Sequence, residues 1–529
     1  MTDETTDVLI VGGSMAGLSM ALFLAQQGVR PLLVERHAEI SAHPRAQAAS
    51  PRTMELLRAL GLEEEVRAQE NPHARYGDIL QAASLAGAEL GRFDGPFRHD
   101  PHDVGTTGWT LIGQDRLEPV LRSRAELLGA DVRFGTELTD FAQDGEGVDA
   151  VLRTPGGAER RVRARYLVAA DGSRARIRER LGIGAHGRGV FGRQMNVIFH
   201  ADLDPYVAGR RFFLCFVNNP VVKGVLGKLG GDGTDRWVLA PSLPPGASHQ
   251  EYDEEACVEL VRAAVGVPGL DVRVEATSSW EIAARVADRF AHGRVLLIGD
   301  CAHVMPPTGG FGGNLGIQDA HNLAWKLALV LRGTAGPELL DSYPREREPA
   351  AEFTVEQAVI RYLQRSGLDE EAAARHRPET TVLFGQVYRS DAVLAEDGPD
   401  DGSPVEDPTR PSGRPGTRAP HLPLDRDGSS VPLHDLLGGG FRLLTGPAGG
   451  VWEEAAARAS AGTGIPLPVD RAGADGSPGT ADRFVEAYGV GPGGAVLIRP
   501  DGFIAWRTPE PSAAPAAELR AALARVLHR

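Results

Sequence analysis

The first 35 residues alternate between apolar and polar stretches in the order strand, helix, strand. An apolar run at 8–11 is followed by a glycine-rich turn and a helical stretch that ends at Gln27, before Gly28. A second apolar run occupies 31–34. Two buried strands joined by one helix form a parallel pair, because parallel strands need a helical crossover. The chain is therefore expected to begin with a Rossmann-like α/β domain.

Later stretches show different patterns. From about 190 to 280 the alternation is typical of strands, as at 212–217 and 237–239, and it predicts a mostly antiparallel sheet inserted in the first domain. A helical region follows from about 319 to 375. Residues 396–420 hold six prolines and four glycines, a composition typical of a linker.

The last hundred residues predict a small α/β domain of their own. A strand at 441–444 and a helix at 452–460 precede two apolar alternations, which Asp501-Gly502 separates. Asp-Gly between two such stretches is a strong signal for a β-hairpin. A closing helix at 513–527 completes this domain.

Composition and charge narrow the functional classes. The 529 residues suffice for two or three domains, and the formal net charge of -15 disfavours nucleic acid and anionic membranes as partners. No apolar run approaches the roughly 20 residues of a membrane-spanning helix. Cys215, Cys257 and Cys301 form neither a CxxC pair nor a metal-ligand spacing. We therefore expect no disulfide, no metal and a cytoplasmic location.

The first motif that carries chemistry is the turn from Gly12 to Gly17, directly after a strand and opening a helix. Such a turn places a pyrophosphate on the helix N-terminus, where free N–H groups and the helix dipole favour an anion. Ser14 replaces the middle glycine, which weakens the motif. Glu35 ends the second strand, where an acid can bind ribose hydroxyls; alone, it would be read as a solvated surface acid.

Two further motifs follow buried strands. Asp171-Gly172-Ser173 comes after an apolar strand, although this triplet is usually only a turn. A strand at 294–298 ends in Gly299-Asp300, and prolines and glycines at 306–313 open a helix whose N-terminus favours an anion. Asp300 could accept hydrogen bonds from a ribitol chain or could cap a helix.

These motifs, in this order and spacing, resemble the class A flavoprotein monooxygenases, which share the fold of para-hydroxybenzoate hydroxylase. The likeness runs from about residue 5 to 395. It includes Pro44-Arg45-Ala46 and the segment that begins at Gln114, which are similar to family segments whose arginine and glutamine contact FAD. The resemblance implies an FAD site made of Gly12, Ser14, Met15, Ala16, Gly17, Glu35, Arg36, Arg45, Gln114, Asp171, Asp300, Pro307, Gly312, Gly313, Asn314 and Leu315.

Over nearly the whole chain, the sequence is similar to hydroxylases that tailor aromatic polyketides. Gly108-Trp109, the run at 411–416 and a thioredoxin-like end that contains 499–502 carry this likeness. No cysteine follows Cys301, so the last domain cannot perform dithiol chemistry. The resemblance implies a discontinuous FAD-binding domain with its helical region (1–180 and 281–395), a substrate-binding β-sheet domain (181–280), a linker (396–420) and a thioredoxin-like domain (421–529).

The resemblance also implies a reaction. NADPH or NADH reduces FAD, dioxygen adds to the flavin, and the C4a-hydroperoxide transfers one oxygen to an electron-rich ring of a polycyclic aromatic substrate. Two alternatives stay open on this scaffold: Baeyer–Villiger oxidation of a ketone, and a flavin oxidoreductase that does not transfer oxygen. A homodimer is a further expectation.

Candidate catalytic and substrate residues lie outside the FAD motifs. Arg365 falls where the helical region is expected to approach the substrate, and its charge could lower the pKa of a phenol. The alternative is an exposed helical arginine. Phe213, Phe216 and Trp237, on the inserted sheet, could line an apolar pocket or fill a core.

Overall fold

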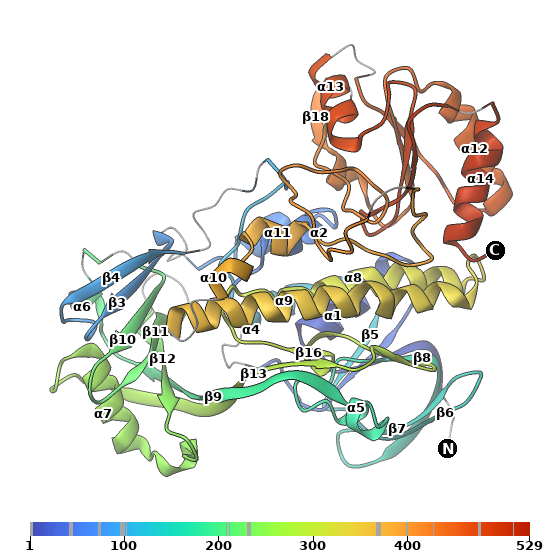
Figure 1. The fold of residues 1–529 in the computed structure, drawn as a ribbon. Helices are drawn as coiled ribbons and strands as arrows, with labels where there is room; N and C mark the ends of the chain where they lie inside the picture. Colours follow the sequence, from blue (N-terminus) through green and yellow to red (C-terminus); the bar gives the residue numbers. More distant parts are fainter. Residues whose placement is uncertain are drawn as a thin grey trace.

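The structure is a computed structural model that describes residues 4–41, 46–71, 76–95, 101, 103–207, 209–210, 212–229, 234–366, 372–397, 400–426, 428–473, 478–511 and 513–529. Figure 1 shows three parts: a central body crossed by long helices, a sheet at its left end, and the C-terminal part above its right end. Among the described residues, no helix is both long and apolar enough to cross a membrane.

The central body is built on a largely parallel sheet. Its parallel strands follow the order β15 (Val295–Leu297), β8 (Glu159–Ala169), β1 (Glu4–Val11), β2 (Leu32–Glu35) and β5 (Asp131–Phe134). Antiparallel strands β14 (Ala291–His292), β6 (Glu137–Gln143) and β7 (Val148–Arg153) extend it. Helix α1 (Met15–Gln26) joins β1 to β2, which confirms the predicted strand–helix–strand unit.

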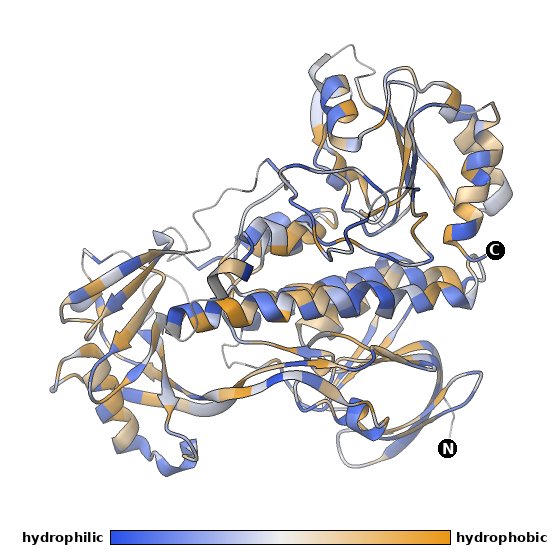
Figure 2. Cartoon of the chain, in the orientation of Figure 1, coloured by the Kyte–Doolittle hydropathy of each residue, from blue (hydrophilic) through white to orange (hydrophobic). Residues whose placement is uncertain are grey.

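Helices surround this sheet. The long ones are α4 (Gln114–Leu127), α8 (Phe311–Leu331) and α9 (Ser342–Ser366). Shorter ones are α2 (Pro51–Arg58), α3 (Glu63–Arg67), α5 (Arg176–Arg180), α10 (Ala372–Arg375), α11 (Glu379–Phe384), η4 (Gly299–Cys301) and η5 (Pro337–Asp341). Figure 2 shows many hydrophilic residues along α9, although this helix crosses the middle of the molecule. Buried charges on α9 therefore need partners within the protein.

The second sheet has eight strands and confirms the predicted mostly antiparallel arrangement. Its order is β16 (His303–Val304), β13 (Arg273–Ala287), β9 (Ala185–His200), β12 (Arg236–Leu243), β11 (Lys223–Lys228), β10 (Leu214–Asn218), β3 (Asp78–Ala82) and β4 (Glu89–Asp94). Only β10 and β3 pair in parallel among these neighbours. The sheet extends beyond 181–280, because β3 and β4 come from the first domain's range. Nearby lie α6 (Asp204–Val207), η3 (His249–Glu251) and α7 (Glu254–Val265).

The C-terminal part has a four-stranded sheet in the order β20 (Val469–Arg471), β19 (Arg442–Thr445), β21 (Ala495–Ile498) and β22 (Ile504–Thr508). Helices α12 (Val451–Thr463), α13 (Pro478–Tyr488) and α14 (Pro515–Val526) flank it, and β17 (Pro423–Arg426), β18 (Ser429–Pro432) and η6 (Leu433–Leu436) precede it. The antiparallel β21–β22 pair confirms the predicted hairpin. Gly502 has φ +84°, which its turn position requires.

The C-terminal part packs closely on the central body. One hydrophobic core contains residues of both, and Trp325 on α8 meets Phe441 edge to face at 5.7 Å. The proline-rich segment at 400–420 also packs, through isolated bridges from Val387 to Thr417 and from Arg418 to Phe503. Residues 415–420 are buried, whereas 400–412 are exposed or half-buried, so only the end of this segment packs into the interface.

Candidate active site

The glycine-rich turn closes against its neighbours so tightly that side chains are excluded. At Gly12, with φ +115°, a Cβ atom would lie 2.1 Å from the carbonyl oxygen of Ala170 on the adjacent strand end. At Gly17 it would lie 1.9 Å from the carbonyl oxygen of Gly12. Ser14 is the N-cap of α1 and gives no side-chain cap to the helix. The first turn of α1 therefore offers its N–H groups to an anion.

Glu35 lies at the end of β2 directly against this turn. Its Oε2 accepts a hydrogen bond from the Gly13 N–H at 2.8 Å, and its Oε1 accepts one from the His37 N–H at 2.9 Å. The carboxylate is thus oriented by the backbone at the strand end, where a ribose would meet it. Arg36, the next residue, is exposed.

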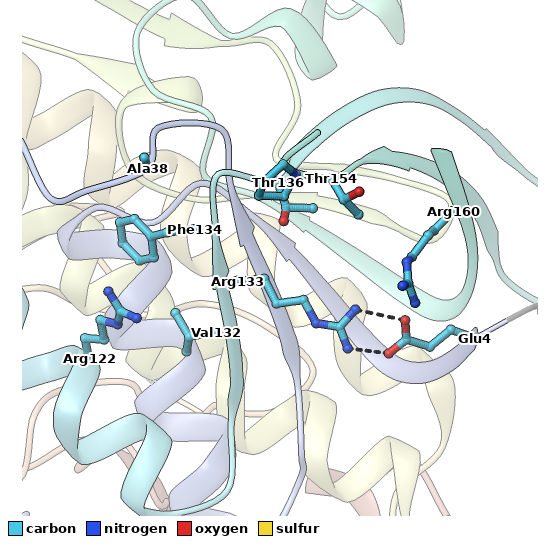
Figure 3. A pocket seen from close by; sticks show the side chains of 10 residues that line it. Glu4, Ala38, Arg122, Val132, Arg133, Phe134, Thr136, Thr154 and Arg160 are labelled. Carbon is cyan, nitrogen blue, oxygen red and sulfur yellow. Dashed lines mark hydrogen bonds and ion pairs between the residues drawn. The ribbon is translucent and has the colours of Figure 1, made fainter. Parts of the chain in front are cut away.

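An open pocket of about 780 Å³ adjoins the Glu35 turn at the outer edge of the sheet (Figure 3). Phe134 connects the two, since its ring lies 3.1 Å from where a Cβ of Gly13 would be. The guanidinium of Arg122 lies 4.5 Å from the centre of that ring. Arg133 donates to Glu4 at 2.9 Å across the pocket. The lining is Glu4, Ala38, Arg122, Val132, Arg133, Phe134, Thr136, Thr154, Pro155 and Arg160.

Asp171 follows β8 and lies at the same edge of the sheet as Glu35, the edge formed by the carboxyl ends of the parallel strands. Its Oδ2 accepts a hydrogen bond from the Ile177 N–H at 3.0 Å. Its Oδ1 is buried and has no hydrogen-bond partner in the described part of the chain. Burial raises the pKa of this carboxyl. An orphaned buried oxygen at the carboxyl end of a parallel strand is suited to receive a ligand's hydrogen-bond donor.

Two helix N-termini meet at Gly299, which begins η4. Gly299 has φ +65°, and a Cβ atom there would lie 2.8 Å from the Cβ of Ala16. A Cβ on Gly316 would lie 3.0 Å from the Gly299 Cα, and one on Gly313 would lie 3.2 Å from Met15 Cε. Small residues thus bring the starts of α1 and α8 together beside Asp300, which is exposed.

The other residues predicted to bind FAD differ in their contacts and exposure. Asn314 Oδ1 accepts from the Ser50 N–H at 2.8 Å, and its Nδ2 donates to the Ala48 carbonyl at 3.1 Å. Gln114 opens α4 and donates to Glu118 at 2.6 Å. Leu315 is buried, Gly312 is half-buried and Pro307 is exposed. Arg45 lies outside the described residues.

These observations fit a bound dinucleotide. The carboxyl ends of β1, β2, β8 and β15 lie at one edge of the sheet, with two uncapped helix starts beside them. Open α/β sheets bind ligands at this edge. Glycines at 12, 13 and 17 let the turn pack closely against the end of β8, Glu35 and the start of α1, and Glu35 and Asp171 supply acceptors there.

The predicted substrate residues separate onto the two faces of the second sheet. Trp237 belongs to the core between this sheet and α7 and is only 1% exposed. Phe213 and Phe216 are half-buried, and Phe216 lies on the opposite face from Cys215, which is in that core. Trp237 therefore fills a core and does not line a substrate wall, because strand alternation turns it toward α7.

The structure places a different arginine from Arg365 beside the start of α8. Arg365 lies near the end of α9 and is exposed. Arg361, about one turn earlier, places its guanidinium 5.2 Å from the ring centre of Phe311, the first residue of α8. Burial lowers the pKa of Arg361 to about 10, although Glu379 opposes this. The group therefore stays charged at neutral pH.

Sequence reasoning missed Arg361 and the cluster around it. Trp109 donates from Nε1 to Glu379 at 2.8 Å, and both lie in or beside a small apolar cluster with Phe311. The helical spacing at 361–365 placed two arginines near the expected substrate, and only the direction of each side chain separates them. A signal was available in Trp109, which the resemblance had already singled out.

The fold and site define the class: an α/β FAD-dependent oxidoreductase with an added sheet and a thioredoxin-like end. Residues 5–358 match the family described as FAD binding domain, and residues 412–529 match the family described as aromatic-ring hydroxylase, C-terminal. The chain therefore belongs to the FAD-dependent aromatic-ring hydroxylases, and it is a monooxygenase of that family.

The names of similar proteins agree with this assignment. The chain is 45% identical to 4-methyl-5-nitrocatechol 5-monooxygenase of a Burkholderia species, over 100% of this chain and 98% of that protein. It is 42% identical to aklavinone 12-hydroxylase of Streptomyces purpurascens, over 100% of both. A crystal structure of aklavinone-11 hydroxylase with FAD and aklavinone matches with a TM-score of 0.91, at 42% identity over 100% of both chains. These matches confirm the predicted fold class, cofactor and enzyme class.

Proposed function

We propose that this monooxygenase hydroxylates a polycyclic phenol of the aromatic polyketide type, with NADPH or NADH as reductant. When bound, FAD takes a hydride from the nicotinamide and activates dioxygen, so that one oxygen atom enters the ring and the other leaves as water. We further propose that the enzyme works in the cytoplasm as a homodimer and that neither nucleic acid nor a membrane is its partner.

The observation that carries the substrate class is a wide apolar row on the face of the second sheet that is turned away from α7. Register places Ile79, Leu214, Gly227, Val238 and Ile198 side by side on five neighbouring strands. At about 4.8 Å between strands, this row is roughly 19 Å wide. Such a width accommodates several fused rings, and aklavinone in the matching complex is a ligand of this kind of enzyme.

The C-terminal part of helix α9 contacts the second sheet. Tyr362 packs against Phe191 of β9 with ring centres 5.4 Å apart, which fixes the C-terminal part of α9 on the sheet. Arg361 lies on the same part of α9 against Phe311. A fixed cation at this place lowers the pKa of a bound phenol, and the phenolate is the more reactive ring. We therefore assign to Arg361 the role that sequence reasoning gave to Arg365.

The test is turnover with labelled dioxygen. Purified enzyme with FAD is incubated with NADPH or NADH and either a tetracyclic polyketide phenol or 4-methyl-5-nitrocatechol, the compound in the name of the Burkholderia relative. The proposal expects one labelled oxygen atom in the tetracyclic product and faster nicotinamide oxidation with that compound. Turnover of the nitrocatechol alone would overturn the substrate class. A lactone product would assign the enzyme to Baeyer–Villiger oxidation.

A further inference from the structure

The turn that joins β21 to β22 is buried against helices of the central body. Arg499 donates from both Nη atoms to the two carboxylate oxygens of Glu346 on α9, at 2.6 and 2.8 Å. Asp501 Oδ2 accepts from Asn322 Nδ2 and Trp325 Nε1 of α8, each at 3.2 Å. Arg499 and Glu346 have no exposed side-chain surface, and Asp501 has 2%. The C-terminal part is thus hydrogen-bonded to both α8 and α9.

Tyr388 connects the C-terminal turn to Arg347 on α9. Its ring stacks on Phe503 with centres 3.9 Å apart, and the Arg499 guanidinium lies 5.5 Å from the Tyr388 ring centre. The Tyr388 hydroxyl accepts a hydrogen bond from Arg347 Nη1 at 2.8 Å. Gln386 Oε1 accepts from the same Nη1 at 2.8 Å. The orientation of the Arg347 side chain therefore depends on residues held by the C-terminal turn.

Arg347 in turn orients Asp319, the carboxylate that accepts a hydrogen bond from the Gly299 N–H. Its Nε donates to Asp319 Oδ1 at 2.9 Å. Asp319 Oδ2 accepts from the Gly299 N–H at 3.1 Å and lies 2.6 Å from His303 Nε2. Burial opposes ionisation of Asp319, but His303 and Arg347 outweigh it, so that its pKa is below the ordinary value. A buried carboxylate held in this way fixes the Gly299 amide.

We propose that the C-terminal part positions the Gly299-Asp300 turn for FAD, through Tyr388, Arg347 and Asp319. The turn needs such support because Gly299 lies where α1 and α8 meet with no spare space. This inference rests on the placement of FAD at that turn. It gives the cysteine-free C-terminal part a role in cofactor binding, in addition to any role in stability.

The test compares Tyr388→Phe with Asp435→Asn as a matched control. Tyr388→Phe removes one hydroxyl and keeps the stacked ring. Asp435→Asn weakens another contact between the same two parts, in which Arg58 donates to Asp435 at 2.8 and 2.9 Å. No described hydrogen bond links Asp435 to Asp319. Apo protein is titrated with FAD by flavin fluorescence, and hydrogen exchange is followed by mass spectrometry in a peptide that contains Gly299.

We expect Tyr388→Phe to raise the Kd for FAD about three- to tenfold, the effect of one lost hydrogen bond, and to speed exchange around Gly299. Asp435→Asn is expected to lower the unfolding midpoint of the apo protein while FAD affinity and that exchange stay unchanged. An unchanged Kd and exchange rate in Tyr388→Phe would overturn the inference. Equal losses of affinity in both variants would also overturn it, because they would indicate general loosening. Failure of the unmodified protein to bind FAD would instead refute the cofactor site itself.

Discussion

The contact of Gly299 with Ala16 is one of the close contacts at the proposed cofactor site, and it gives a sharp prediction. Gly299→Ala places a Cβ atom 2.8 Å from the Ala16 Cβ and forces a left-handed backbone at φ +65° on an alanine. Gly182→Ala is the matched control. Gly182 has φ +67° and is exposed, and a Cβ atom there meets nothing within 4 Å.

The two effects have separable magnitudes. Left-handed backbone costs an alanine about 1–2 kcal/mol of folding stability, and both variants bear this cost. Overpacking adds about 1–3 kcal/mol in Gly299→Ala alone. The contact is relieved only if η4 moves from the start of α1, and FAD binding must restore the original spacing. The same 1–3 kcal/mol then opposes binding, which raises the Kd for FAD about 5- to 150-fold.

The assay is titration of apo protein with FAD by flavin fluorescence, with urea unfolding of the apo forms in parallel. Gly182→Ala is expected to lose stability and keep the Kd of the unmodified protein. Gly299→Ala is expected to lose both, and the double variant Ala16→Gly with Gly299→Ala to recover much of its FAD affinity. If Gly299→Ala bound FAD with the same Kd as the unmodified protein, the placement of the pyrophosphate where α1 and α8 meet would be refuted.

Two other predictions concern charge. Arg361→Met is expected to slow hydroxylation and to raise the peroxide formed per NADPH at least several-fold, whereas Arg365→Met is expected to change neither. Oxygen and peroxide electrodes measure both quantities. Equal effects of the two substitutions would remove Arg361 from the reaction. Burial lowers the pKa of His421 to about 4 and that of His434 well below its ordinary value, with Arg418 adding to both shifts. The unfolded chain binds these protons near pH 6.5, so the free energy of unfolding is expected to fall as pH falls from about 6.5 to 4. His421→Asn should flatten that dependence in urea unfolding at pH 7, 6 and 5, and an unaltered slope would contradict the assignment.

The parts of the site that sequence could predict are those made by backbone geometry. A glycine-rich turn between a buried strand and a helix fixes where N–H groups point, and the acid at the next strand end must lie beside it. The hydrogen bond from the Gly13 N–H to Glu35 shows this local logic directly. The same holds for Asp501-Gly502, since an apolar alternation on each side of Asp-Gly leaves few other conformations.

Side-chain direction over long distances could not be predicted in the same way. Arg361 and Arg365 are both polar residues on one helix, and their difference depends on how Tyr362 docks on Phe191. Trp237 belongs to a strand with apolar residues at both parities, so its face is decided by α7, which lies elsewhere in the sequence. Strands β3 and β4 joined the second sheet through pairing with β10, a contact between segments more than a hundred residues apart.

Buried charges at and beside the contact between the two parts of the chain bear on why the C-terminal part is retained. Arg347, Arg499, Glu346 and Asp319 have no exposed side-chain surface. Taking such ions from water costs several kcal/mol each, and well-packed apolar residues often give equal or greater stability. Stability alone therefore does not account for this network. Charged, bidentate contacts do restrict geometry, because each fixes distance and angle at both ends. The bidentate Arg499–Glu346 pair joins the two parts, and the Arg347–Asp319 pair within the central body ends at the Gly299 amide. The geometry that these contacts restrict therefore includes that of the proposed cofactor turn.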